Sequence, residues 1–182
     1  MNVFYLSEDP IEAAQMSCDR HVVKMILESA QLLSTAHRIL DGNEITEDKL
    51  INGKVKKTKR LQHPDSNLDV LLYNATHVNH PSAIWCRASV QNYNWLANHM
   101  IALGEEYKYR YEKTHLTITK LGVELLCAPK NLKEITFFQP PPAMSKEFII
   151  SDNSVDNYRN YYKNGKRHLH SWKKRGAPTW IN

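Results

Sequence analysis

The sequence predicts a mainly α-helical fold: a single-domain helical bundle with a small β-hairpin insertion. Apolar residues recur at helical spacing over several long stretches, which is the main signal for amphipathic helices. The length of 182 residues and the hydrophobic fraction of 42% are those of one globular domain. An Asn-Gly pair between alternating residues indicates one hairpin. Because we find no internal repeat and no long linker, we treat residues 1–182 as one helical domain.

The first half of the chain contains two expected helices and the hairpin. Residues 2–6 are apolar and β-prone, so we expect an edge strand or a buried arm there. A short helix should open at Pro10, since proline suits the first helical position. A longer helix is expected over residues 19–40, where Asp41-Gly42 ends the apolar repeat. The hairpin turn falls in residues 51–55, and the second arm carries a cluster of lysines.

Three more helices are expected in the second half. The longest should run from Pro81 to about residue 112, with the proline again in the first turn. A short helix over residues 119–127 is stopped by Pro129. We expect the last helix over residues 154–174, because one aromatic and apolar stripe continues through its glycine.

The positive charge is concentrated in two segments. The net charge is +5, yet residues 53–62 hold five basic side chains without an acid, and residues 158–175 hold seven without an acid. The rest of the chain carries 12 basic residues against 19 acidic ones. This distribution favours a local anion-binding surface. Solvated lysine faces kept for solubility give the same pattern.

The cysteines and the N-terminus indicate a cytoplasmic protein. Cys18, Cys86 and Cys127 are far apart and form no CxxC pair, which argues against a disulfide framework. The first ten residues lack the basic and apolar regions of a signal peptide. No stretch approaches the roughly 18 apolar residues of a membrane span, so we expect no membrane partner.

The helix expected over residues 19–40 carries a polar stripe that can form one wall of a ligand site. Its members recur three and four positions apart: His21, Lys24, Glu28, Gln31, Thr35 and Arg38. On one wall of a cleft, His21 can transfer a proton, while Lys24, Glu28 and Gln31 can bind a phosphate-bearing ligand. The alternative is that the stripe is the solvent face of an amphipathic helix.

The start of the next long helix is a second candidate for ligand binding. Asn79 and His80 stand where free backbone N–H groups meet the positive end of the helix dipole. His80 can serve there as a general acid or base, Trp85 can stack a base, and Arg87 can contact phosphate. The alternative is that Trp85 lies in the core and the asparagines of this helix only cap or bridge.

The C-terminal segment mixes aromatic and basic side chains in a way that suits phosphate contacts. We expect Arg159, Lys163 and Arg167 to contribute to ligand binding. The stripe through Tyr158 and Tyr162 is better explained as the packed face of the helix.

No metal and no cofactor are expected from the sequence patterns. The close histidine groups are His77-x-x-His80, His168-x-His170 and His63-Pro64-Asp65, and none lies near a cysteine or glutamate in a zinc pattern. No GxSxG motif is present, and no cysteine has an activating partner beside it.

Three segments resemble a known family. MNVFYLSEDP…CDRHVVKMILESAQLLSTAHRIL at the N-terminus, NHPSAIW from Asn79 and YRNYY from Tyr158 are similar to small accessory proteins of tailed bacteriophages, notably phages of marine cyanobacteria. The resemblance implies a protein made in the host cytoplasm and assigns no catalytic residue. A smaller likeness, in Pro178-Thr179-Trp180 and Tyr161-Tyr162, is to phage pyrimidine-dimer glycosylases. The two motifs occur here in the opposite order, and Asn2 replaces the threonine nucleophile of those enzymes.

Three functions are compatible with these patterns. In the first, a helical pocket binds a phosphate-bearing nucleotide and sequesters it, for example as a host defence signal. In the second, the same pocket is that of a phosphodiesterase or another nucleotide-processing enzyme, with His21 or His80 as general acid or base. In the third, the basic segments bind DNA or RNA along a surface, and the pocket is only core. A homo-oligomer fits any of the three.

Overall fold

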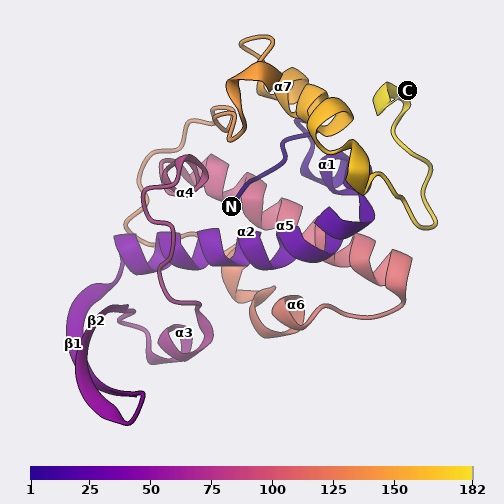
Figure 1. Cartoon of the computed structure of the whole chain (residues 1–182). Helices are drawn as coiled ribbons and strands as arrows, with labels where there is room; N and C mark the ends of the chain where they lie inside the picture. The colour runs from indigo at the N-terminus through magenta and orange to yellow at the C-terminus, as the bar shows by residue number, and fades with distance from the viewer. Residues whose placement is uncertain (182) are drawn as a thin grey trace.

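The computed structural model describes residues 1–181 and has two 22-residue helices at its centre. α2 (Asp19–Leu40) and α5 (Val90–Tyr111) pack against each other, and shorter helices surround them (Figure 1). α1 (Pro10–Met16) packs on α5, and α4 (Pro81–Cys86) packs on α2. The described residues form seven α-helices and one two-stranded antiparallel sheet, which confirms the predicted fold class.

The core follows from the apolar spacing of the two long helices. Val22, Ile26, Ala30 and Leu33 of α2 have no exposed surface and recur three and four positions apart. α5 opposes them with a second fully buried set: Tyr93, Leu96, Met100 and Leu103. Each large apolar side chain buried in this way stabilises the fold by roughly 1.5–3 kcal/mol.

Residues 2–6 form a buried arm and not an edge strand. Val3, Tyr5 and Leu6 are at most 1% exposed, and the segment has no strand partner. The phenyl ring of Phe4 lies against His21 of α2 and against the aromatic rings of the C-terminal segment. The N-terminal arm therefore fills the space between α2 and the C-terminal elements.

The helix expected over residues 81–112 is two helices. α4 ends at Cys86, and α5 begins at Val90. Ser89 has extended backbone angles, and its hydroxyl accepts a hydrogen bond from the amide of Gln91, as a helix N-cap does. The amide of Val90 donates to the carbonyl of Glu134, a contact that a continuous helix would not permit.

The last helix is also shorter than expected. α7 (Ser154–Asn160) continues into a π turn over Tyr161–Gly165 and a single 3₁₀ turn, and the rest of the chain to residue 178 is irregular. At Gly165 a Cβ atom would lie 2.6 Å from the ring of Tyr161, so this glycine permits a close approach. The expected helix assumes that the aromatic stripe keeps an α-helical period, and the π turn interrupts that period.

The remaining helices are short and lie at the periphery. α3 (Ser66–Leu71) begins where the chain leaves the hairpin, at an N-cap formed by Asp65. α6 (Leu116–Leu121) and a 3₁₀ turn over Glu124–Leu126 replace the helix expected over residues 119–127. Among residues 1–181, no helix is long and apolar enough to cross a membrane.

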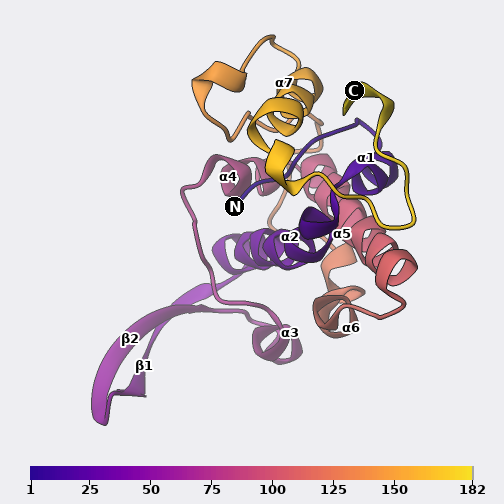
Figure 2. The same cartoon turned by 45° about the vertical axis from the view of Figure 1, so that its right-hand side comes forward.

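The hairpin is confirmed and is longer than its turn signal indicated. β1 (Asn43–Ile51) pairs with β2 (Lys54–Gln62) through a turn in which Asn52 and Gly53 have φ angles of 52° and 74°. Positive φ at both central residues suits the right-handed twist of paired strands, which explains the Asn-Gly sequence. The hairpin leaves the end of α2 and projects from the helical body as an arm (Figures 1 and 2).

Candidate nucleic-acid interface

The polar stripe of α2 lies under other parts of the chain. His21 is 5% exposed, its ring stacks on Phe4 at 4.1 Å between centroids, and its Nδ1 shares a hydrogen bond with the hydroxyl of Tyr162. Burial, together with the positive charges of Lys166 and Lys24, lowers the pKa of His21 to about 3. A buried neutral imidazole that stacks on one ring and shares a hydrogen bond with another residue has a structural role, so the geometry does not support the predicted role of His21 in proton transfer.

The next members of the stripe hold the N-terminus. The carboxylate of Glu28 accepts a hydrogen bond from the amide of Asn2 at 3.2 Å and lies 3.8 Å from the amino group of Met1. Lys24 pairs with Glu28 at 3.2 Å while most of its side chain stays in solvent. Gln31 is half-buried. This part of α2 is therefore a docking seam for the N-terminal arm, and not an open cleft wall.

The start of α4 is occupied by its own cap. The Nδ1 atom of His80 accepts a hydrogen bond from the amide of Ser82 at 3.2 Å, while Asn79 is exposed. Burial, followed by the charge of the N-terminal amine, lowers the pKa of His80. Trp85 is 2% exposed and its indole donates to the carbonyl of Phe138, so the core alternative holds for this tryptophan. Arg87 is half-buried, and its Nη1 atom has no hydrogen-bond partner among the described residues.

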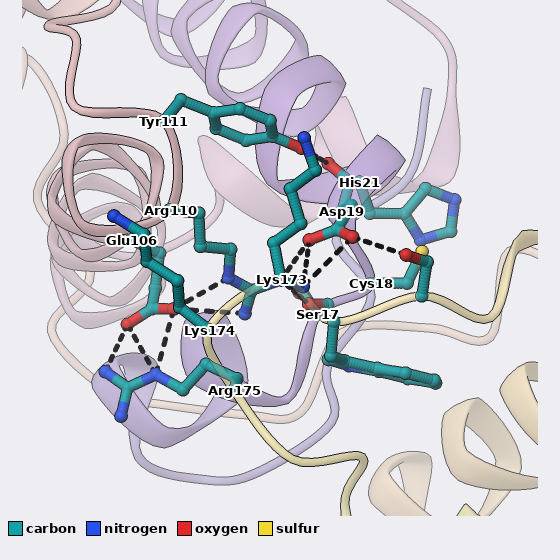
Figure 3. Close-up of polar contacts among 12 residues, drawn as sticks. Ser17, Cys18, Asp19, His21, Glu106, Arg110, Tyr111, Lys173, Lys174 and Arg175 are labelled. Atoms are coloured by element: carbon teal, nitrogen blue, oxygen red, sulfur yellow. Dashed lines mark hydrogen bonds and ion pairs between the residues drawn. The ribbon is translucent and has the colours of Figure 1, made fainter.

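Several C-terminal basic residues are engaged in internal contacts. The Asp19 carboxylate accepts hydrogen bonds from the guanidinium of Arg110, the hydroxyl of Ser171 and the amide of Lys173 at 2.6–3.1 Å (Figure 3). Arg175 pairs with Glu106 at 2.6 Å. Lys174 also pairs with Glu112 at 2.6 Å. These contacts attach the C-terminal tail to α2 and α5 and engage the charges of Lys174 and Arg175, whereas the side chain of Lys173 stays exposed.

The rest of that segment divides into one structural arginine and an exposed basic patch. Arg159 donates to the carbonyl of Leu6 at 2.9 Å and lies over the ring of Trp180, so it fixes the N-terminal arm. Lys163 and Arg167 are exposed and line a 340 Å³ cavity near the C-terminus. In this segment a role in ligand binding stays a prediction for Lys163 and Arg167, whereas Arg159 is engaged in internal contacts.

The hairpin separates its charges onto two faces. Directly opposed residues share a face, and the register opposes Lys49 to Lys56 and Asp48 to Lys57. One face, which we call the basic face, has a net charge of +3; its charged residues are Glu47, Lys49, Lys54, Lys56 and Arg60. The other, the neutral face, has two acids against two lysines; its charged residues are Glu44, Asp48, Lys57 and Lys59.

The basic face becomes free of acids toward the tip of the arm. Midway along the arm, Glu47 pairs with Arg60 at 2.8 Å and with Lys49 at 3.3 Å. Lys54 and Lys56, beside the turn, are exposed and make no ion pair among the described residues. On the neutral face, Lys59 pairs with Glu44 at 2.7 Å.

The base of the arm is fixed to the body by Asp69. Its Oδ1 atom accepts hydrogen bonds from Arg38 at 2.7 Å, from Arg60 at 2.9 Å and from the amide of His63 at 2.8 Å. Burial disfavours the charge of Asp69, but the hydrogen bonds from Arg60 and Arg38 outweigh it and hold the pKa of the carboxyl well below its usual range. The lower part of the arm therefore has a defined position.

One cluster of possible metal ligands was not indicated by the histidine spacings. His37, Asp41 and His63 place one ligand atom each within 4.8 Å of one another. They border a cavity of 410 Å³ at the base of the arm. The hairpin register could have indicated this cluster. Pairing of Asn43 with Gln62 brings together the residues that flank the two strands, including Asp41 and His63.

No protein-family model, curated protein or solved structure matches this chain.

Proposed function

We propose that the protein binds nucleic acid through the basic face of the hairpin arm, with the lysines near the tip in contact with the phosphate backbone. The observation that carries the proposal is the strand register, which gives one face a charge of +3 and leaves the other neutral. Lysines spread for solubility would have no reason to gather on one face. A run of cations without acids is the usual electrostatic footprint of a nucleic-acid surface.

The shape of the arm supports the same function. A two-stranded β-ribbon fits into the major groove of duplex DNA. The arm projects from the helical body (Figure 2). On its basic face Lys49, Lys54 and Lys56 are exposed, whereas Glu47 and Arg60 are half-buried. An isolated two-stranded ribbon is only marginally stable in water, and like charges placed opposite each other weaken it further. A phosphate near Lys49 and Lys56 would relieve that repulsion.

The nucleotide-pocket functions have less support from the geometry. The N-terminal arm fills the space in front of His21 and Glu28, where a nucleotide was expected. A phosphodiesterase that used His21 would need a histidine that can take up a proton near neutral pH, and burial keeps this one neutral. Surface binding needs neither an open pocket nor a titrating group. It also fits the phage setting that the family resemblance implies.

The test is the salt dependence of binding to duplex DNA, single-stranded DNA and RNA oligonucleotides, measured by fluorescence anisotropy. The variant Lys54→Gln/Lys56→Gln removes two cations from the basic face. We expect about tenfold weaker binding at fixed low salt, and a slope of log K against log salt that is shallower by about 2.

The matched control is Lys57→Gln/Lys59→Gln, which removes the same charge from the neutral face. We expect its slope to stay close to that of the unmodified protein, because Lys59 pairs with Glu44 and Lys57 lies opposite Asp48 in the register. Equal losses in the two variants would show that only net charge matters. No binding to any of the three oligonucleotides at low salt would overturn the proposal.

A further inference from the structure

Three buried side chains meet where the hairpin joins the helical body. His37 lies in the last turn of α2, Asp41 caps that helix four residues later, and His63 follows β2 directly. His37 and His63 are 3% and 5% exposed, and the Asp41 side chain is 5% exposed. The ring of His63 packs edge-to-face against His37, with the Nε2 atom of His63 3.9 Å from Oδ2 of Asp41.

The hydrogen bonds of His37 leave one ring nitrogen free. Its Nε2 atom lies 3.1 Å from the carbonyl oxygen of Cys127 and 3.0 Å from the hydroxyl of Tyr93. A carbonyl can only accept, so Nε2 carries the proton and donates. The lone pair therefore lies on Nδ1, which is buried and has no partner among the described residues. A histidine whose other nitrogen donates to a backbone carbonyl is oriented as metal-binding histidines are.

Asp41 and His63 also have polar atoms without a full set of hydrogen bonds in the cluster that contains His37. The Asp41 carboxylate is held by the amides of Lys130 at 2.8 Å and Asn131 at 3.0 Å, and it keeps free lone pairs. The Nε2 atom of His63 is buried without a hydrogen-bond partner, while Nδ1 accepts from the amide of Asp65 at 3.1 Å. An unsatisfied buried polar atom costs roughly 1–3 kcal/mol, so two in one place indicate a missing partner.

We propose that His37, Asp41 and His63 bind a divalent transition-metal ion of the zinc class. Two imidazoles and one carboxylate are a donor set that such ions take at sites with an open position. The ligand atoms lie within 4.8 Å of one another, and a tetrahedral zinc ion needs neighbouring ligands roughly 3.4 Å apart. The side chains would therefore close by about 1 Å on binding. The adjoining cavity leaves the fourth position open to a water or a ligand.

Binding at His63 requires its proton to move. Because Nδ1 accepts from the amide of Asp65, the neutral ring carries its proton on Nε2, the atom that would bind the metal. Metal binding through Nε2 transfers that proton to Nδ1 and gives up the contact with Asp65. The number of protons on the ring does not change. This exchange of tautomer gives the site a signature that folding alone does not produce.

The experiment is a titration of chelator-treated protein with Co²⁺ and Zn²⁺, in a Cys127→Ser background so that the exposed thiol beside the cavity cannot bind metal. We expect one ion per chain, the intense visible bands of tetrahedral cobalt, and displacement of Co²⁺ by Zn²⁺. In ¹⁵N spectra, the proton of His63 should appear on Nδ1 after zinc is added.

Variants separate this site from adventitious binding. His63→Ala should weaken zinc binding about 100-fold or more, and Asp41→Asn is the second test, with folding of each checked by circular dichroism. His168→Ala, at the exposed histidine of the His168-x-His170 pair, is the matched control and should bind as before. If His63→Ala folds and binds zinc unchanged, or if the parent protein takes up no ion at micromolar concentration, the proposal is wrong.

Discussion

The two ends of α2 differ in how completely their polar groups are paired. Arg38 near the C-terminal end pairs with Asp69, but other polar groups at that end have no partner among the described residues. At the N-terminal end, Asp19 and Arg110 are buried and their hydrogen-bonding atoms have partners (Figure 3). At the C-terminal end, the Nδ1 atom of His37 is buried without a partner, and the arm beyond it carries lysines without acids near its tip. Complete pairing is what a structural network needs. At the hairpin end, two buried ring nitrogens without a partner lie in one cluster of possible metal ligands, and lysines without ion pairs lie on one face of the arm, which is why we place the functions there.

Removing Arg110 should have the largest effect on stability. Its guanidinium is fully buried and pairs with Asp19 at 3.1 Å and with Glu106 at 3.0 Å. Arg110→Met removes the buried cation that Asp19 and Glu106 share, although Arg175 still pairs with Glu106, so we expect the free energy of unfolding in urea to fall by about 3–5 kcal/mol. Lys108→Met, on the exposed side of the same helix, should change it by less than about 0.5 kcal/mol. Similar small losses in both variants would show that the network is not structural.

His21, at the same end of α2, should make the free energy of unfolding depend on pH, with a smaller effect than the loss of Arg110. The pKa of His21 is about 3 in the folded protein, below the value of roughly 6.5 in an unfolded chain, so the unfolded state takes up the proton first. The stabilisation is therefore complete above pH 6.5 and is lost as the pH falls toward 3. Between pH 7 and pH 5 we expect His21 to account for a loss of about 2 kcal/mol.

Chemical unfolding at the two pH values measures this contribution. His21→Gln should be less stable at pH 7 but should show a loss between pH 7 and pH 5 that is smaller by that amount. His168→Gln, at an exposed histidine, keeps the full dependence. A slope that His21→Gln leaves unchanged would contradict the assignment of His21 as a buried neutral group.

At the hairpin end, single charge reversals should separate stability from binding. Lys56→Glu places an acid opposite Lys49. We expect the free energy of unfolding, measured by thermal unfolding, to rise by about 0.5 kcal/mol. Nucleic-acid affinity should fall about tenfold or more. Lys57→Glu places an acid opposite Asp48, so we expect its free energy of unfolding to fall by about 0.5 kcal/mol. This variant should bind nucleic acid more tightly than Lys56→Glu does. If the two variants change the free energy of unfolding in the same direction and lose the same nucleic-acid affinity, the two faces of the arm are equivalent.

Much of the fold could be predicted from local signals. The apolar repeat and its stop at Asp41-Gly42 define α2, and the Asn52-Gly53 pair defines the hairpin. The break between α4 and α5 depends on Ser89, whose capping hydroxyl is a weaker signal than the apolar residues on both sides. The π turn after α7 could not be predicted, because an apolar repeat with an α-helical period does not indicate where a π turn begins.

The candidate sites were harder to predict because they depend on long-range packing. Nothing in the spacing of His21 and Glu28 shows that residues 2–6 cover them, since that contact joins distant parts of the chain. The two faces of the hairpin and the approach of Asp41 to His63 do not depend on such long-range packing. Both follow from counting outward along the strands from the Asn-Gly turn, so they were available in the sequence once the strand length was known.

The measurement that tests the central claim most directly is an amide NMR titration with the oligonucleotide that binds best. We predict shifts concentrated on the arm around Lys49, Lys54 and Lys56, with the Asp19–Arg110 network unchanged. Shifts confined to the C-terminal patch around Lys163 and Arg167, with none on the arm, would contradict the proposal that the hairpin is the nucleic-acid interface.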